Sequence, residues 1–300
     1  MLNKKHIFIS LCAFICFAGG LGAGYIGAQY FSSSNKKPVI TPVHKKSIGK
    51  STEKISIQNT TMPTGDLPSW QQIFAEDFTK DASLGSMGSD DNAGKIVYTG
   101  ANNTKWVTYP KTYLDTYQKR PYRSDKVLSV HDGMLDFYLH SVDGQPAGAN
   151  PSPVIDGKSQ YQTYGRYSAR FKLESNSPMN EYYIAWLLWP ENDADWQCAE
   201  SDFPEMPLND DKVKVVAHYG CMGEQDLLYK QIDVKQWHTY TQEWLPDKRN
   251  YYLDDTLIAT STNQVFSKPQ RWQLQTETNG QGDSSGHLLV DWAVVYKYSP

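Results

Sequence analysis

Three carboxylates lie within one short segment in the middle of the sequence, at Glu200, Asp202 and Glu205. In an extended strand successive side chains point to opposite faces, so Glu200 and Asp202 share one face and Glu205 falls on the other. A β-bulge around Phe203 and Pro204 would return Glu205 to the first face. Proline cannot donate a ladder hydrogen bond and is expected at bulges and strand edges. A bulged strand here would therefore gather all three acids.

Grouped carboxylates can perform acid–base chemistry because they cannot all stay ionised cheaply. A neighbouring negative charge raises the pKa of a carboxyl group, so one member of such a set holds its proton while another is ionised. The set then contains one acid and one base, the pair that general acid–base catalysis requires. The alternative interpretation is a solvated acidic edge with no catalytic role. The surrounding sequence distinguishes between a catalytic cluster and such an edge.

The segments that must position these acids have the pattern of β-strands. Residues 164–173 alternate, with Tyr167, Ala169, Phe171 and Leu173 on one side and polar side chains on the other, which is typical of a half-buried strand. No segment sustains a helical period. The sequence predicts an all-β fold, a β-sandwich of two antiparallel sheets. The expected strands are 134–140, 164–173, 184–189, 212–219, 237–244, 250–253, 271–276 and 287–298.

Two cysteines, Cys198 and Cys221, lie outside the N-terminal apolar segment. Outside the cell two such cysteines favour a disulfide, whereas in a reducing compartment they would be ordinary thiols. A hairpin that places Cys198 opposite Cys221 also places Glu200 opposite Tyr219. The bulge can shift this register by one residue and place His218 opposite Glu200 instead. His218 is therefore a candidate site residue, with a structural histidine as the alternative.

The N-terminal part of the chain has a separate character. Residues 7–31 carry no charge and are long enough to span a hydrocarbon core, and Lys4 and Lys5 favour an N-terminus inside the cell. We expect residues 1–31 to form an uncleaved membrane anchor, with a cleaved signal segment as the alternative. Residues 32–62, rich in Ser, Thr, Pro and Lys, predict a disordered basic linker. Residues 63–300 are expected to form one domain on the extracellular face of the membrane.

The charge distribution restricts the partners of that domain. The whole chain has a net charge of −4, yet the linker and N-terminus are basic, so residues 63–300 hold a net charge of about −11. An acidic domain is a poor partner for nucleic acid and is compatible with a neutral polymer such as a glycan. We expect a monomer that acts on polysaccharide.

The motif Glu200 to Glu205 resembles glycoside hydrolase family 16, the retaining β-glucanase-like enzymes with a Glu-x-Asp-x-x-Glu signature. The resemblance extends over residues 63–298, and it implies a jelly roll of concanavalin A type with the acids on its concave sheet. Ser201 departs from the pattern, because the family usually has an aliphatic residue there. The polar stretch 273–277 is another departure, and it bears on the substrate. Further matching segments are Trp70–Phe74, Glu76–Phe78, Tyr164–Tyr167, Ala185–Leu188, Trp237–Tyr240, Glu243–Trp244 and Val290–Trp292.

Carried onto this chain, the resemblance implies that Glu200 is the nucleophile, that Glu205 is the general acid and then the base, and that Asp202 tunes both. Retention of configuration requires two carboxyl groups roughly 5 to 5.5 Å apart. The expected activity is hydrolysis of a β-linked polysaccharide by a retaining endo-glycosidase, with a covalent glycosyl-enzyme intermediate and no cofactor for catalysis. The resemblance also implies a structural calcium ion held by Asp77 and Asp291, and a plain surface role for both is the alternative.

Aromatic side chains are the expected platforms for sugar rings. The candidate substrate-binding residues are Trp186, Trp189, Trp196, His218, Trp272 and Glu277. Most Trp residues in a β-sandwich are core residues, which is the alternative for each. Trp196, in a polar loop, is the strongest candidate.

Two other functions remain open from the sequence. A transglycosylase would use the same intermediate and pass it to a sugar in place of water. A non-catalytic carbohydrate-binding module of lectin type would use the acids for hydrogen bonds or calcium, but it does not need a matched acid and nucleophile. The sequence does not identify the glycan.

Overall fold

The computed structural model describes residues 61–89 and 94–300. The expected anchor over residues 1–31 and nearly all of the expected linker lie outside the described residues. Within residues 61–89 and 94–300, no helix has the length and apolar character needed to cross a membrane.

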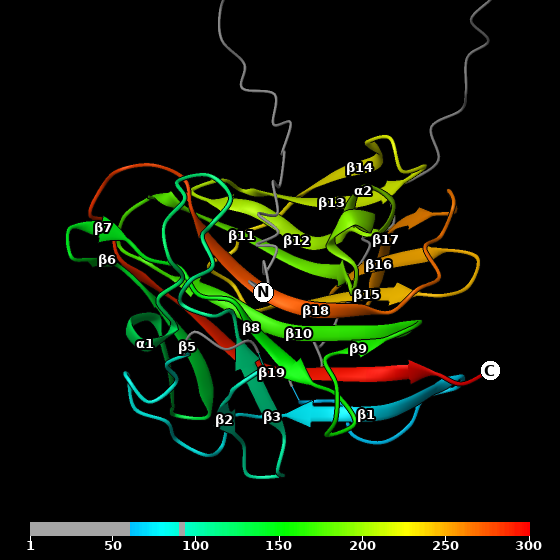
Figure 1. Cartoon of the computed structure of the whole chain (residues 1–300), viewed down its shortest axis with the longest axis horizontal. Coiled ribbons are helices and arrows are strands. Elements are labelled where there is room, and N and C mark those ends of the chain that lie inside the picture. Colours follow the sequence, from blue (N-terminus) through cyan, green and yellow to red (C-terminus); the bar gives the residue numbers. More distant parts are fainter. Residues whose placement is uncertain (1–60, 90–93) are drawn as a thin grey trace, which may run out of the picture. The chain divides into compact units, whose positions relative to one another are not determined.

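Two large antiparallel sheets form most of the domain, as expected (Figure 1), and a three-stranded and a two-stranded sheet accompany them. The larger sheet has the order β17-β16-β15-β10-β19-β5-β4, with β1 also paired to β19. Its strands are β1 (Trp70–Glu76), β4 (Leu128–His131), β5 (Met134–Leu139), β10 (Gly165–Glu174), β15 (His238–Trp244), β16 (Arg249–Leu253), β17 (Thr256–Ser261) and β19 (Gly286–Tyr298).

The smaller sheet has the order β14-β13-β12-β11-β18-β9 and contains the acidic motif. Its strands are β9 (Tyr161–Gln162), β11 (Met179–Pro190), β12 (Ser201–Leu208), β13 (Lys212–Tyr219), β14 (Glu224–Gln231) and β18 (Gln270–Thr278).

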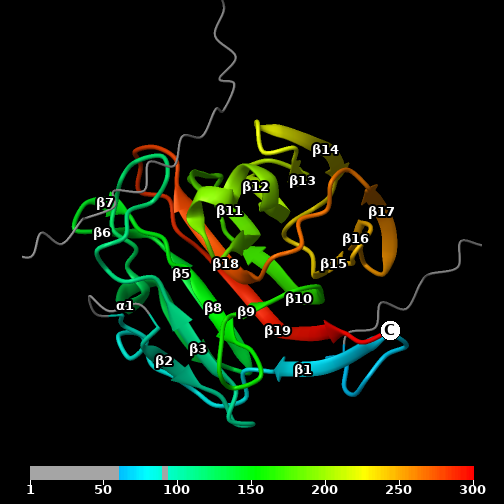
Figure 2. The same cartoon turned by 45° about the vertical axis from the view of Figure 1, so that its right-hand side comes forward.

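Short elements complete the described part of the chain. They are β2 (Ile96–Thr99), β3 (Lys105–Thr108), α1 (Ser124–Val127), β6 (Ser141–Val142), β7 (Gln145–Pro146), β8 (Pro151–Val154), the 3-10 turn Asp193–Asp195 and α2 (Trp196–Ala199). Figure 2 shows α1, β2 and β3 grouped on one side of the domain, away from β14 to β17.

The core lies between the two sheets, where each sheet contributes one face of alternating side chains. Tyr167, Ala169, Phe171 and Leu173 all enter it, which confirms the alternation expected for β10. The Phe171 ring lies 4.4 Å from that of Trp186 on the opposite sheet, measured between centroids. Aromatic pairs of this kind add about 0.5–1.5 kcal/mol beyond the area that they bury.

All eight expected strands are present, with ends that differ by a few residues. The sequence did not predict the edge strands β14 and β17, and the reason is their exposure. Leu227 and Tyr229 of β14 and Leu257 of β17 are exposed apolar side chains, so neither strand shows the in–out alternation that marks a half-buried strand.

Candidate active site

A bulge in β12 brings two of the three acids onto one face. The strand shifts register between Asp202 and Glu205 against both neighbours, β11 and β13. Phe203 and Met206 enter the hydrophobic core. Asp202 and Glu205 therefore point to the other side of the sheet, away from the core. The bulge expected around Phe203 and Pro204 is confirmed.

Glu200 lies between α2 and β12, directly before the bulged strand. Its backbone N–H donates to the carbonyl of Trp196, and its own carbonyl accepts from the N–H of His218 at 2.9 Å. His218 Nε2 lies 3.8 Å from Glu200 Oε2. Of the two registers left open by the sequence, the structure has the shifted one, in which His218 and not Tyr219 faces Glu200.

His218 is held neutral by its surroundings. Its side chain is buried beside the acids. Burial, followed by the charges of Arg249 and Lys214, lowers the pKa of His218 to about 4. A neutral imidazole beside Glu200 can donate or accept a hydrogen bond but carries no charge to a ligand at neutral pH.

Asp202 lies between the two glutamates and is itself buried. Burial and the charges of Glu200 and Glu205 raise the pKa of Asp202 well above its ordinary range. Asp202 therefore keeps its proton to higher pH than an ordinary aspartate and, while protonated, can donate a hydrogen bond, which is the kind of division that grouped acids were expected to show.

Glu205 has two partners that the sequence analysis did not identify. Lys214 Nζ lies 2.8 Å from Glu205 Oε1, and the Tyr183 hydroxyl donates to the same oxygen. Although burial opposes it, the charge of Glu205 raises the pKa of Lys214, so the ammonium form of Lys214 is favoured here. The bulged hairpin register places Lys214 opposite Glu205, and that register was the one sequence signal that could have found it.

A loop at residues 109–122 covers the neighbouring part of the same face. The Tyr117 ring packs against that of Tyr183, with centroids 5.9 Å apart. Glu277 of β18 accepts hydrogen bonds from Thr116 N, Thr116 Oγ1 and Tyr122 Oη at 3.0, 2.7 and 2.9 Å. The Glu277 carboxylate therefore holds the loop in place through Oε1, and a contact between Glu277 and substrate stays a prediction.

The four candidate tryptophans divide between the two faces of the sheet. Trp186 and Trp272 lie in the hydrophobic core at 0% and 2% exposure, so the prediction that they bind sugar is wrong. Side chains alternate along β11, and Trp186 shares its face with the core residues Ile184 and Leu188. A ring packed between the sheets cannot present a face to a ligand.

Trp189 and Trp196 lie on the side of the acids. Trp189 is nearly buried, and its Nε1 donates to Asp193 Oδ1 at 2.7 Å. Trp196 is only partly buried, and its ring meets the His218 ring edge-on with centroids 5.6 Å apart. Trp196 is therefore the tryptophan best placed to present a ring next to Glu200.

The structure does not assemble the expected calcium site. Asp291 is paired with Arg170 at 2.5 Å, and Asp77 accepts hydrogen bonds from Thr79. A guanidinium on the Asp291 carboxylate does not fit a bound Ca²⁺, which needs several oxygen ligands free of such competition. Among the residues described, one group of three has ligand atoms within 4.8 Å of one another, namely Glu200, Asp202 and His218.

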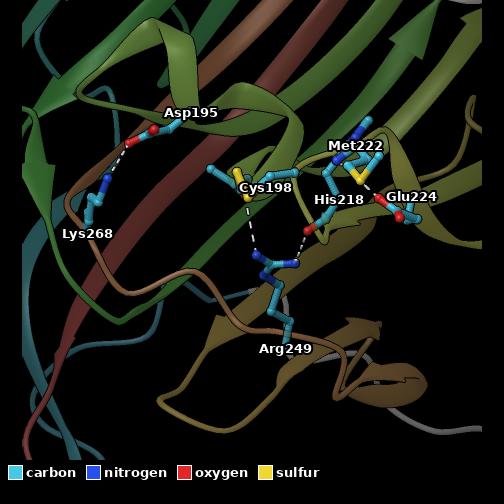
Figure 3. Close-up of a disulfide and its surroundings, with 9 residues drawn as sticks. Asp195, Cys198, His218, Met222, Glu224, Arg249 and Lys268 are labelled. Carbon is cyan, nitrogen blue, oxygen red and sulfur yellow. Dashed lines mark hydrogen bonds and ion pairs between the residues drawn. A yellow bond between two sulfur atoms is a disulfide. The ribbon is translucent and has the colours of Figure 1, made fainter.

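The disulfide between Cys198 and Cys221 is present, as the sequence predicted. It joins α2, directly before Glu200, to the loop after β13, directly beyond His218 (Figure 3). The bridge therefore closes the corner of the site formed by Trp196, Glu200 and His218.

A β-sandwich whose bulged strand carries Asp202 and Glu205 on one face, with Glu200 directly before that strand, provides the paired carboxyl groups that glycosidases use to cleave glycosidic bonds. The family model "Glycosyl hydrolases family 16" matches residues 98–293, and the chain belongs to this family.

Individual relatives are more distant. A β-glucanase of Bacillus subtilis (strain 168) is 26% identical over 123 residues, a match that covers 40% of this chain and about half, 48%, of that protein. The endo-1,3-β-glucanase (laminarinase) catalytic domain of Thermotoga petrophila RKU-1 has a TM-score of 0.55 at 16% identity, covering 78% of this chain and 100% of that one. The laminarinase of Rhodothermus marinus has a TM-score of 0.54 at 20% identity, covering 78% and 100%. At these identities the two structures show that the fold is shared.

Proposed function

We propose that this protein is a retaining endo-β-glucanase that hydrolyses a β-linked glucan by double displacement. The observation that carries the proposal is the arrangement of the three acids. The bulge places Asp202 and Glu205 on one face, and carboxylate oxygens of Glu200 and Asp202 lie within 4.8 Å of each other. Family membership supports the same chemistry.

In the first step Glu200 attacks the anomeric carbon, while Glu205 protonates the oxygen of the departing sugar. Asp202, which holds a proton, can donate a hydrogen bond to Glu200 and so favour its ionised form. The nucleophile thereby keeps its negative charge although it is buried. Both reacting groups are side chains, so this route requires no metal or organic cofactor.

In the second step Glu205 accepts a proton from the water that hydrolyses the covalent intermediate. Lys214 and Tyr183 both contact Glu205 Oε1 and would hold the carboxylate in place for this step. For the first step Glu205 must be protonated, and its carbonyl oxygen can then still accept from Lys214.

The substrate class is a β-glucan, and the support for it is the nature of the relatives. The B. subtilis relative is a β-glucanase, and two of the structures that share the fold are laminarinases. Trp196 is the side chain that would stack on a sugar ring next to Glu200.

The deciding experiment is a screen of the purified protein against 1,3-β-glucan, mixed-linkage glucan, 1,4-β-glucan and galactan, with product sizing and NMR of the first anomer formed. We expect mid-chain cleavage of one glucan and a first product of retained configuration. A first product of inverted configuration would contradict the double displacement. Products longer than the substrate would identify a transglycosylase, and binding without turnover would identify a carbohydrate-binding module.

We further propose that the domain works outside the cell. The disulfide supports this, because such bridges persist in oxidising compartments. Attachment to the membrane through residues 1–31 is part of the same proposal. Fractionation of cells into membrane, medium and cytoplasm, followed by detection of the chain, tests both points.

A further inference from the structure

Arg249 is a buried cation directly behind the catalytic strand. It begins β16 in the larger sheet, is 1% exposed, and reaches across the sandwich to the smaller sheet. Its two terminal nitrogens donate to the carbonyls of His218 and Ala199, at 2.8 and 3.5 Å (Figure 3).

The two carbonyls that Arg249 binds lie on either side of Glu200. Ala199 precedes Glu200 in the chain, and His218 pairs with the Glu200 backbone across the hairpin. The Ala199 carbonyl also accepts from Gln270 Nε2 at 2.9 Å. Two side chains that are distant in sequence, Arg249 and Gln270, therefore fix the backbone from which the Glu200 side chain extends.

The layer between Arg249 and the acids is polar. Ser201, where the family pattern has an aliphatic residue, lies 2.7 Å from the Tyr251 hydroxyl and 3.3 Å from Gln242 Oε1. An aliphatic residue at this position could form neither hydrogen bond. The departure at Ser201 is therefore part of a buried polar layer that includes Arg249.

A guanidinium in such a layer needs a compensating negative charge. Burying a cation without one costs several kcal/mol. Among the acids of the motif, Asp202 interacts with the charge of Arg249, and this charge opposes the rise in the pKa of Asp202 that burial and the two glutamates cause. Burial lowers the pKa of Arg249, but the charge interactions with Tyr251, Asp226 and Asp202 oppose this. The charged or titratable groups around this layer are Glu200, Asp202, Glu205, Lys214, His218, Asp226 and Tyr251.

We propose that Arg249 is a positioning residue of the glycosidase reaction. Its charge favours the ionised state of the acid cluster, which it reaches through Asp202, and its two hydrogen bonds hold the backbone on both sides of Glu200. This inference rests on the proposed function for its catalytic part. Its electrostatic part concerns the folded protein alone and can be tested without a substrate.

The first test measures the thermal unfolding midpoint of the whole protein between about pH 4 and pH 8, the range over which carboxyl groups ionise. Wild type is compared with Arg249→Met, Arg249→Lys and Gln270→Met. The last variant is a control, because it removes a neutral donor to the Ala199 carbonyl, which Arg249 also binds. The difference in unfolding midpoint between wild type and Arg249→Met should increase as pH rises. The acids become charged over this range, and in the variant they lack their counter-ion. Arg249→Lys should reduce that widening, and the Gln270→Met gap should not depend on pH.

The same comparison in two variant backgrounds shows which acids interact with the charge of Arg249. In a Glu200→Gln, Asp202→Asn background the pH-dependent part of the gap should shrink, whereas in an Asp226→Asn background it should persist. A gap that is the same at every pH would overturn the proposal, since it would reduce Arg249 to a packing and hydrogen-bonding residue. Persistence in the first background, or loss in the second, would also overturn it. If Arg249→Met does not fold, the same comparisons with Arg249→Lys and Arg249→Gln decide the question.

The second test is the pH profile of kcat/KM. The acidic limb should move to higher pH in Arg249→Met, by on the order of one pH unit, with Arg249→Lys in between. The loss of activity should therefore be greater at pH 5 than at pH 8. An equal loss at all pH values would overturn the catalytic part. If wild type cleaves no glycan at all, the proposed function fails, and the unfolding measurements still decide the electrostatic part.

Discussion

Lys214 and Glu205 stand opposite each other on neighbouring strands, with Nζ 2.8 Å from Oε1. They can meet only because the bulge in β12 turns Glu205 onto the face where Lys214 lies. The same local irregularity thus assembles the acids and provides one of them with a counter-ion. This dependence makes the roles of the acids testable one at a time.

The nucleophile is tested by Glu200→Ala. We expect turnover to fall by roughly 10⁴-fold or more, as for loss of other covalent nucleophiles. Azide with an activated glycoside should restore a reaction that gives an inverted azide adduct, because the anion fills the space of the lost carboxylate. The adduct's configuration is read by NMR. Glu174→Ala, at an exposed position at the end of β10, is the control; near-normal activity of Glu200→Ala would contradict the assignment.

The acid–base residue is tested by Glu205→Ala. Substrates with good leaving groups need little protonation, so they should still form the covalent intermediate, whereas natural glycans should be cleaved about 10²- to 10⁴-fold more slowly. Azide should then intercept the intermediate and give a retained adduct. Pre-steady-state kinetics and NMR of the adduct provide the measurement. Equal losses for activated and natural substrates would rule out this role.

The central acid is tested by Asp202→Asn. The amide keeps a hydrogen-bond donor but cannot exchange a proton with its neighbours, so we expect a loss intermediate between wild type and Glu200→Ala, about 10²-fold in kcat. Burial and the two glutamates raise the pKa of Asp202, and an amide removes that titration from the pH profile of kcat/KM. An unchanged profile with unchanged kcat would show that Asp202 tunes neither glutamate.

His218 predicts a specific pH dependence of stability. Its pKa is lowered to about 4 in the folded state, below the ordinary value of 6.5, so protonation favours the unfolded chain. The folded state should lose stability as pH falls from about 6.5 to about 4, by at most about 3 kcal/mol. Chemical unfolding of wild type and His218→Gln across this range measures the difference. If the two curves stay parallel, His218 is not held neutral.

The disulfide predicts a loss of stability on reduction. Cys198 and Cys221 are 23 residues apart in sequence, and a loop of this size corresponds to about 3 kcal/mol. Cys198→Ala with Cys221→Ala should lower the free energy of unfolding by this amount, and reduction of wild type should match it. Alkylation under denaturing, non-reducing conditions gives the control, because two free thiols there would contradict the bridge in the isolated protein.

Much of this arrangement could be predicted because it depends on local sequence. The spacing of Glu200, Asp202 and Glu205, together with Pro204, indicated a bulge and a shared face. The alternation in residues 164–173 indicated a half-buried strand. The spacing of the cysteines indicated a bridge. Each of these signals follows from the two-residue period of a strand or from the chemistry of one residue type.

The predictions that failed needed the packing of one sheet on the other. The run from Ile184 to Pro190 is apolar on both faces, since both are covered, so alternation could not tell Trp186 in the core from Trp189 on the opposite side. The hydrogen bonds between Glu277 and the loop at residues 109–122 likewise depend on the tertiary structure.

The sequence by itself determined which acids are present, how they are spaced, and that a bulged strand of an all-β chain would bring them together. Only the tertiary structure decided which remote groups reach them. Tyr183, Lys214 and Arg249 come from three different strands, and Arg249 comes from the other sheet. Contacts of this kind depend on strand register and on the stacking of the two sheets, and a two-residue period carries information about neither.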